Sequence, residues 1–415
     1  MTVVEREVVI DGLGDQADGL ARSDGQRLAV PGALPGERHL VRFALDGNPT
    51  VIATSVARFG EVERAAPPCP HFSTCGGCVS QHLMPADETA WKLGRVRHAL
   101  ARRGLRPPVE WAHQSPLGSR RRIRLGVERR HGAPELGYRA RRSNRVVDVD
   151  RCPIADPRLV ALLAPLRVLL ERLDWRPSEV ELTEHAGFVD LLWIGSASPT
   201  LDDREQLATF ADDQDLARLG WQTRSDVVAE PILVRRTPEL SWPALSVVPP
   251  LGVFVQPTVA GERALQSLVS GALAGAGRVV DLYAGIGTLA AAALDAGAKV
   301  VAVERDGDAV AAMAGRHPRL EVLRRDLDRA PLGSAELEQF DAAVLDPPRR
   351  GAEAQVGALA GSRIERVVYV SCAPVTFARD AASLVEGGLD LRSVAVVDQF
   401  RYAAEIELVG VFVRQ

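Results

Sequence analysis

The chain has 415 residues, of which 46% are hydrophobic and 25% are charged, and its formal net charge is -4. This length predicts about two to four domains, and the composition excludes fibrous and intrinsically disordered proteins. The first residues carry acids where a signal peptide is basic, and no apolar run is long enough to span a membrane. We therefore expect a cytoplasmic protein with no membrane partner. Taken alone, the net charge argues against nucleic-acid binding.

Three segments with different patterns follow one another along the chain. Residues 1–62 alternate short apolar runs with Gly, Asp and Pro, which predicts a small OB-like β-barrel. Residues 63–250 begin at a proline-rich joint and mix strand-like runs with a helical pattern at 156–174, so we expect an α+β domain there. In residues 251–415, wholly apolar strands alternate with helices, which predicts a Rossmann-like, doubly wound α/β domain.

A strand, an acidic residue and a Gly-x-Gly turn precede a helix at 279–288. Glycines at this place let the backbone approach a ligand closely at the carboxyl end of the sheet. Glu304 ends the next strand, where an acid can bind ribose hydroxyls, and Asp326 follows the third, where it could bind an adenine amino group. This set favours S-adenosylmethionine, which has no pyrophosphate, over NAD. The alternative is a tight turn with helix caps and surface acids.

Two further strand ends carry groups suited to pyrimidine chemistry. Asp346 ends the fourth strand, and Arg349 stands where amine methyltransferases place a stacking aromatic residue. Cys372 ends the fifth strand, where a thiolate could add to carbon 6 of a pyrimidine and activate carbon 5. A base must then remove the carbon 5 proton, and Glu405 and Glu407 are both candidates that spacing does not separate. The alternative for Cys372 is a buried core cysteine.

The other four cysteines have the spacing of a metal site. Three are close together and one follows much later; they are Cys69, Cys75, Cys78 and Cys152. This pattern offers one Cys-x2-Cys pair, whereas structural zinc sites usually have two such pairs or histidine partners. Four thiolates suit a [4Fe-4S] cluster, while His71 and His82 keep zinc as an alternative.

Basic residues greatly outnumber acidic ones between Lys92 and Arg151. This local excess predicts a phosphate-binding surface that the whole-chain charge conceals. The densest patch consists of Arg120, Arg121, Arg122 and Arg124. The alternative is a solvated charged face. If the ligand is RNA, its target base must be single-stranded or flipped out of the stack.

Three motifs, DLYAGIG, DPPRRG and SCAPVTFARD, resemble those of the RNA 5-methyluridine (uracil-C5) methyltransferases that carry an iron-sulfur cluster. The resemblance covers nearly the whole chain. It implies a class I methyltransferase domain, S-adenosylmethionine as cofactor and a central domain whose four cysteines hold a structural [4Fe-4S] cluster. The catalytic residues it implies are Cys372 as nucleophile, Glu407 as base and Asp346. The resemblance implies Gln256, Tyr283, Glu304, Asp326 and Asp346 as ligand positions. With the glycine turn and the residue that follows it, the predicted cofactor-binding residues are Gln256, Asp281, Tyr283, Gly285, Gly287, Thr288, Glu304, Asp326 and Asp346.

The N-terminal segment resembles the TRAM domain of RNA-modifying enzymes, which would add a second grip on RNA. Small barrels also serve as protein–protein modules, which is the alternative. The family resemblance favours 23S rRNA as the substrate, with tRNA as the second choice, and it implies no obligate protein partner.

Two rival functions follow from the sequence. A cytosine C5-methyltransferase would place a cysteine after the strand-four proline motif or use two cysteines in the catalytic domain, where this chain has only Cys372. An RNA-binding protein or chaperone without catalysis is suggested by departures from the family pattern. These departures are Thr258, Thr288, Ala373, Arg401, Ala403 and Glu405.

Overall fold

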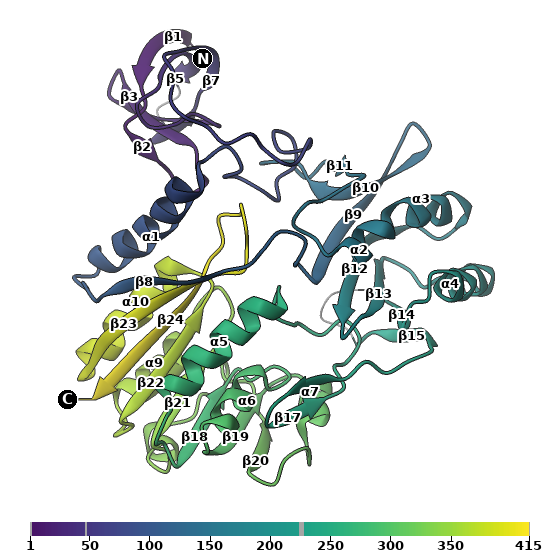
Figure 1. Cartoon of the computed structure of the whole chain (residues 1–415), viewed down its shortest axis with the longest axis vertical. Coiled ribbons are helices and arrows are strands. Elements are labelled where there is room, and N and C mark those ends of the chain that lie inside the picture. The colour runs from purple at the N-terminus through teal and green to yellow at the C-terminus, as the bar shows by residue number, and fades with distance from the viewer. Residues whose placement is uncertain (1, 46–47, 224–227, 415) are drawn as a thin grey trace. The chain divides into compact units, whose positions relative to one another are not determined.

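The computed structural model describes residues 2–45, 48–223 and 228–414 (Figure 1). The chain divides into two compact units. The first is Met1–Val96 with Tyr402–Ala404, and the second is Arg97–Arg401 with Glu405–Gln415. The three-part division at 62/63 and 250/251 stays a prediction. None of the helices within the described ranges has the length and apolarity that crossing a bilayer requires.

The first unit opens with two short sheets that share one core. One has the order β1-β5-β7 and consists of β1 (Thr2–Val9), β5 (Arg38–Leu45) and β7 (Thr54–Phe59). The other has the order β2-β3-β4-β6 and consists of β2 (Gly12–Leu13), β3 (Gly19–Ser23), β4 (Gln26–Val30) and β6 (Thr50–Ile52). Val8, Leu28 and Phe43 are among the buried side chains of this core. The N-terminal residues therefore form the all-β part that their short apolar runs predict.

A short segment near the C-terminus belongs to the first unit. The Tyr402 carbonyl accepts hydrogen bonds from the backbone N–H groups of Val79 (2.7 Å) and Ser80 (3.1 Å), next to Cys78. The Glu88 carboxylate, on α1 (Pro85–Ala101), accepts from the Ser80 hydroxyl (2.8 Å) and the Tyr402 N–H (3.0 Å). The loop that carries the cysteines thus holds the segment just before Glu405 and Glu407.

The second unit contains a seven-stranded sheet, antiparallel except for the β13–β14 pair. In sheet order its strands are β11 (Val146–Asp148), β10 (Ala133–Arg139), β9 (Arg122–Arg130), β12 (Pro177–His185), β13 (Phe188–Gly195), β14 (Arg218–Gln222) and β15 (Glu230–Val234). Its helices are α2 (Pro157–Ala161), α3 (Leu163–Arg172) and α4 (Leu201–Asp213). The helical pattern expected at 156–174 is therefore two helices, which meet at Leu162. Trp175 packs edge-on against Trp193 and Trp221 in the core of this part.

The larger sheet of the second unit has eight strands. In sheet order these are β20 (Leu320–Arg324), β19 (Lys299–Glu304), β18 (Arg278–Leu282), β21 (Ala342–Leu345), β22 (Arg366–Ser371), β24 (Glu407–Arg414), β23 (Leu389–Asp398) and β8 (Val109–Gln114). The first five run parallel, as the apolar strands predict, and β24 is antiparallel to both of its neighbours. Strand β8 pairs in parallel with β23 at the edge, although its residues fall in the segment assigned to the central domain. A hairpin of β16 (Leu240–Trp242) and β17 (Leu245–Val247) precedes this sheet in the chain.

Helices cover both faces of the eight-stranded sheet (Figure 1). They are α5 (Val259–Ala272), α6 (Thr288–Asp295), α7 (Gly307–Met313), α8 (Ser334–Leu337), α9 (Glu353–Ala360) and α10 (Pro374–Glu386). Val368 of β22 shares a core with Leu265 of α5 and Leu289 of α6. The next residue, Tyr369, contacts Phe377 of α10 with ring centroids 5.3 Å apart. Since successive side chains of a strand point to opposite faces, α10 lies across the sheet from α5 and α6.

Candidate active site

The carboxyl ends of the parallel strands bring the predicted site residues to one edge of the larger sheet. Leu282 of β18 is in register with Leu345 of β21 and with Val303 of β19. The residues that follow these three, Tyr283, Asp346 and Glu304, therefore emerge side by side. Ligands of open α/β sheets bind at this edge, so the fold supplies the position that the sequence predicts.

The glycine turn after β18 is strained and open. Tyr283, Gly285 and Gly287 have φ values of 62°, 56° and 89°, in the left-handed region that only glycine adopts without cost. A Cβ atom at Gly287 would lie 2.8 Å from Met313 Sδ, so glycine is required there by packing. A Cβ atom at Gly285 would meet nothing within 4 Å. The backbone at Gly285 is thus exposed to an approaching ligand.

Glu304 is anchored to this turn by backbone donors. Its Oε2 accepts from the N–H of Gly285 at 2.9 Å, and its Oε1 accepts from the N–H groups of Arg305 (2.7 Å) and Asp306 (2.8 Å). These three bonds fix the carboxylate beside Gly285. Oε1 already accepts two hydrogen bonds, whereas Oε2 keeps one free lone pair, which can accept a hydrogen bond from a ribose hydroxyl.

Asp281 is fully buried, and within the described residues neither of its carboxylate oxygens meets a donor with good hydrogen-bond geometry. Burial and the charge of Asp346 raise the pKa of Asp281 well above its usual value; the nearby Ala290 N–H acts in the opposite direction, and the charge of Glu304 raises the pKa further. An unpaired buried carboxyl is costly, and donors of a bound ligand would relieve that cost. A cofactor with a charged amino group, such as S-adenosylmethionine, fits this need.

The other predicted cofactor residues lie around the same edge. Asp326 follows β20 and is half-buried; its Oδ1 accepts from the N–H of Asp328 at 3.1 Å. Thr288 begins α6, is buried, and its carbonyl accepts from Gln266 Nε2 at 3.0 Å. Tyr283 is half-buried, and burial raises the pKa of its hydroxyl, which therefore stays protonated. Tyr283 and Asp326 remain partly accessible to a ligand at this edge.

The predicted nucleophile and the predicted base are brought together by the antiparallel pairing of β22 and β24. Ser371, the last residue of β22, pairs with Leu408, so Cys372 and Glu407 come next to each other at the end of the ladder. Glu407 is buried, and among the described residues its Oε2 makes no hydrogen bond. Burial and the negative charge of Asp346 raise the pKa of Glu407 well above its usual value. Glu405, the other candidate base, differs from Glu407 in its position because it lies outside β24. Its side chain is half-buried and forms an ion pair with Arg349 at 3.1 Å.

Cys372 is partly buried, and burial raises the pKa of its thiol to about 11. The charges of Glu407 and Asp346 act in the same direction, whereas the Arg349 guanidinium lowers the pKa of the thiol. In the ligand-free protein the sulfur is therefore mostly protonated at neutral pH. Sequence reasoning missed this role of Arg349, although its place three residues after Asp346 puts it at the same edge.

The thiol pKa gives a first prediction. The rate at which iodoacetamide alkylates Cys372 should rise about tenfold per pH unit between pH 7 and 10, because only the thiolate reacts. Replacement of Arg349 by glutamine should lower the rate throughout this range, since it removes the cation that favours the thiolate. Quantifying the alkylated Cys372 peptide by mass spectrometry measures both effects, and a rate that is flat with pH would contradict them.

Gln256 connects Asp346 to the β9 side of the second unit. Its Nε2 donates to Asp346 Oδ2 at 3.3 Å. Burial raises the pKa of Asp346 to about 6, although this hydrogen bond acts in the opposite direction. The Gln256 carbonyl accepts from Arg121 Nε at 2.9 Å. Arg121 Nη2 in turn lies 2.6 Å from Glu262 Oε2. A buried ion pair therefore positions the residue that contacts Asp346.

The structure corrects one member of the arginine patch. Arg121 is 3% exposed and paired with Glu262, so its side chain does not reach the surface where RNA would bind. Arg122 is paired with Glu181 and Arg124 with Glu179, both on the adjacent strand β12. A count of local charges could not find these partners, because they lie more than fifty residues away in the sequence.

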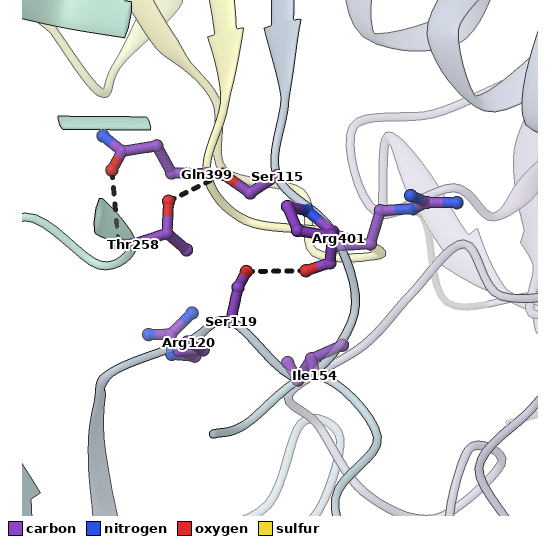
Figure 2. Close-up of a pocket in the computed structure, with 8 residues that line it drawn as sticks. Ser115, Ser119, Arg120, Ile154, Thr258, Gln399 and Arg401 are labelled. Atoms are coloured by element: carbon purple, nitrogen blue, oxygen red, sulfur yellow. Dashed lines mark hydrogen bonds between the residues drawn. The ribbon is translucent and has the colours of Figure 1, made fainter. Parts of the chain in front are cut away.

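Arg120 differs from the rest of the patch. In the described parts of the chain it has no acidic partner, its Nε donates to the Arg122 carbonyl at 3.1 Å, and its guanidinium lies over the ring of Phe400 at 5.6 Å. It lines a pocket together with Ser119 and Arg401, as Figure 2 shows. Arg120 is therefore the member of the patch that is best placed to meet an anion.

The buried Arg121–Glu262 pair gives a second prediction. Replacement of Arg121 by methionine should lower the free energy of unfolding by about 3–5 kcal/mol, because Glu262 is left as an unpaired buried charge. Replacement of Arg124 by methionine is the matched control, and its exposed pair should contribute about 0–1 kcal/mol. Urea denaturation measures both, and equal losses would contradict a structural role for Arg121.

The four cysteines of the predicted cluster are divided between the units. Cys69, Cys75 and Cys78 belong to the first unit, and Cys152 belongs to the second. Cys75 and Cys78 are buried, and the Gly77 N–H donates to Cys75 Sγ at 3.4 Å, a contact that suits a thiolate ligand. Across the described ranges, no group of three or more His, Cys, Asp and Glu side chains is arranged to hold a metal ion.

Similar proteins are known. A family model described as tRNA (Uracil-5-)-methyltransferase matches residues 324–415. A Caulobacter vibrioides protein named "Uncharacterized RNA methyltransferase" is 37% identical, over 99% of this chain and 100% of its own length. The Halomonas elongata 23S rRNA (uracil(1939)-C(5))-methyltransferase RlmD is 35% identical, over 97% of this chain and 88% of its own.

The fold also matches a crystal structure, that of Pyrococcus abyssi tRNA (uracil-54, C5)-methyltransferase in complex with S-adenosyl-L-homocysteine. The TM-score is 0.73 at 20% identity, covering 98% of this chain and 100% of that one. Fold and site together define a class I, S-adenosylmethionine-dependent methyltransferase with mixed α/β sheets. The chain belongs to the RNA (uracil-C5) methyltransferase family, as its motifs predict.

Proposed function

We propose that this enzyme transfers a methyl group from S-adenosylmethionine to carbon 5 of a specific uridine in RNA. The observation that carries the proposal is the juxtaposition of Cys372 and Glu407 across the β22–β24 ladder, beside Asp346. A nucleophile, a base and a third carboxyl at one strand edge are the groups that this reaction needs.

Each step follows from one of these groups. Cys372 first loses its thiol proton to solvent, its thiolate Sγ adds to carbon 6 of the uracil, and the electron pair of the carbon 5–carbon 6 double bond moves toward oxygen 4. When bound, S-adenosylmethionine would supply an electrophilic methyl group to carbon 5 and would leave as S-adenosylhomocysteine. Glu407 then takes the carbon 5 proton, the double bond re-forms, and the bond to Cys372 Sγ breaks to return the thiolate.

The carboxyl pKa values suit these roles. Glu407 must be ionised when it takes the carbon 5 proton, and because burial raises its pKa, the neutral carboxyl that this step leaves is favoured. Asp346, whose pKa is about 6, is mostly ionised at neutral pH and can accept a hydrogen bond from the N–H of the uracil ring. Arg349 offsets the negative charge around Cys372 and so favours the thiolate when the substrate binds.

The residues around the glycine turn would hold the cofactor. Asp281 offers unpaired buried oxygens to an amino group, Glu304 suits the ribose hydroxyls and Asp326 the adenine amino group. The open backbone at Gly285 allows the ligand to come close. Tyr283, Gly287 and Thr288 complete the turn.

We also propose that the protein holds a [4Fe-4S] cluster with a structural role. Its ligands would be Cys69, Cys75, Cys78 and Cys152. The burial of Cys75 and Cys78 and the N–H donor to the Cys75 sulfur support it. Anaerobically purified protein should contain about four iron and four sulfide per chain, as this cluster type requires. Metal analysis checks this, and one zinc with no iron would contradict it.

RNA binding would rest on Arg120 and its pocket, with additional contacts from the exposed parts of the paired residues Arg122 and Arg124. The N-terminal β part, which resembles a TRAM domain in sequence, would add a second contact. We favour 23S rRNA as the substrate because the similar Halomonas protein is named for it, with tRNA as the second candidate.

The test is to map 5-methyluridine in the RNA of cells with and without this protein. We expect one uridine, in 23S rRNA, to lose its methyl group when the protein is absent. A lost site in tRNA would select the second candidate. Identical maps would contradict the proposed activity.

A further inference from the structure

Five buried or partly buried polar residues are joined by a continuous series of hydrogen bonds that ends at Asp346. The Ser115 and Thr258 hydroxyls are 2.6 Å apart, and the Thr258 backbone N–H donates to Gln399 Oε1 at 3.4 Å (Figure 2). Gln399 Nε2 donates to Gln256 Oε1 at 2.8 Å, and Gln256 Nε2 donates to Asp346 Oδ2 at 3.3 Å. This series of hydrogen bonds therefore extends into the candidate active site.

The donor and acceptor directions in this series of hydrogen bonds are fixed by the backbone N–H of Thr258. A backbone N–H can only donate, so the Thr258 N–H requires the oxygen of Gln399 to face it. The amino group of Gln399 must then face Gln256, which in turn must present its own oxygen to Gln399. This leaves the amino group of Gln256 to point toward Asp346. One backbone group thus fixes the orientation of two side-chain amides.

Packing holds both amides in place. Gln399 is 2% exposed and Gln256 is 4% exposed, so bulk solvent has little access to a reversed amide. A Cβ atom at Gly261 would lie 2.3 Å from the Gln399 side chain, so glycine at this position makes the room that Gln399 occupies. Thr258 caps α5, and its hydroxyl accepts from the Gly261 N–H at 3.0 Å, which fixes the loop that carries the backbone donor.

The orientation matters for base recognition. The reacting edge of uracil presents an N3–H donor beside the O4 acceptor, whereas cytosine presents an N3 acceptor beside an amino donor. Asp346 supplies an acceptor, and the second hydrogen of the Gln256 amino group supplies a donor next to it. This pair complements uracil and opposes cytosine. A reversed Gln256 amide would present its oxygen instead, which suits the amino group of cytosine.

We propose that Gln399 is a positioning residue that sets the preference for uracil over cytosine by fixing the amide of Gln256. This inference rests on the proposed uridine methylation and adds to it a residue that bonds to Gln256 and to the Thr258 backbone. Gln399 reaches Asp346 through Gln256, so its effect should fall on base discrimination more than on cofactor binding.

Two substitutions and a matched control test the inference. Gln399→Met keeps the volume but removes the donor, and Gln399→Glu turns the donor into an acceptor, which should reverse the Gln256 amide. The control is Gln355→Met, which alters another fully buried glutamine of the second unit that also bonds to backbone groups, at Leu332. All three should cost stability, but only the first two should change recognition.

The measurement is kcat/KM for an RNA with uridine at the target position, together with the inhibition constant of the same RNA carrying cytidine there. The preference for uridine should fall about 10- to 100-fold in Gln399→Met and further in Gln399→Glu, as expected for hydrogen bonds to a charged partner. The acid limb of the pH profile should also move to higher pH, because Asp346 loses the donor that lowers its pKa. Gln355→Met should change neither.

Each outcome decides between the two claims. If wild-type protein methylates the uridine RNA but both Gln399 variants keep its preference and pH profile, the role of Gln399 is wrong while the proposed function stands. Equal changes in Gln355→Met would also overturn it. If wild-type protein methylates no uridine RNA, the proposed function fails and this inference fails with it.

Discussion

Replacement of Cys372 by alanine is expected to abolish methyl transfer while RNA and S-adenosylmethionine binding persist. Without the sulfur nothing adds to carbon 6, so carbon 5 stays a poor nucleophile and the rate should fall at least about 10³-fold. Cys372 follows β22 at the open edge of the sheet, so its truncation leaves the strand pairing intact.

The loss can be measured as transfer of labelled methyl groups to RNA, with binding followed in parallel. Alanine at Cys152, which also lies in the second unit, is the matched control, and it should spare the chemical step even if it affects metal content. Retained turnover in Cys372→Ala would remove this cysteine from the mechanism. Parallel loss of RNA binding would instead indicate a structural role.

Replacement of Glu407 by glutamine is expected to stop the reaction after methyl transfer. The amide cannot accept the carbon 5 proton, so the bond between Cys372 and the methylated base is not released. Turnover should fall by about 10²- to 10⁴-fold, the usual contribution of a general base. A covalent protein–RNA complex should accumulate and survive denaturing electrophoresis.

Glu405 supplies the control for this experiment. It lies two residues before Glu407 but outside β24, where it pairs with Arg349 and is half-buried. Glu405→Gln should turn over without accumulating a complex. Accumulation in Glu405→Gln and not in Glu407→Gln would show that the base had been assigned to the wrong carboxylate.

Much of the catalytic region could be predicted from the sequence because parallel sheets leave a clear pattern. Buried strands read as short, wholly apolar runs, and the residues that follow them must meet at one edge. This is why Asp346 and Cys372 could be placed together before any contact was known. Spacing alone does not separate Glu405 from Glu407; the family resemblance favours Glu407, and the antiparallel register of β24 places that residue next to Cys372.

Other features depend on long-range partners that no local pattern shows. The burial of Arg121 follows from Glu262, which lies 141 residues away in the sequence. Strand β8 has only six residues, too few to reveal which sheet it joins. The amide chain through Gln399 depends on a contact across 143 residues. Charge density and apolar runs therefore predict a basic segment and a fold class, whereas the partners of individual residues come only from the structure.

The most direct test of the proposed mechanism is tritium release from RNA whose uridines carry tritium at carbon 5. RNA from cells that lack the protein should release tritium when incubated with the protein and S-adenosylmethionine, one atom for each methyl group transferred. The mechanism requires this equality, because the carbon 5 proton leaves only after the methyl group has been added. Methyl transfer without tritium release, or neither from any cellular RNA, would contradict methylation at carbon 5 of uridine.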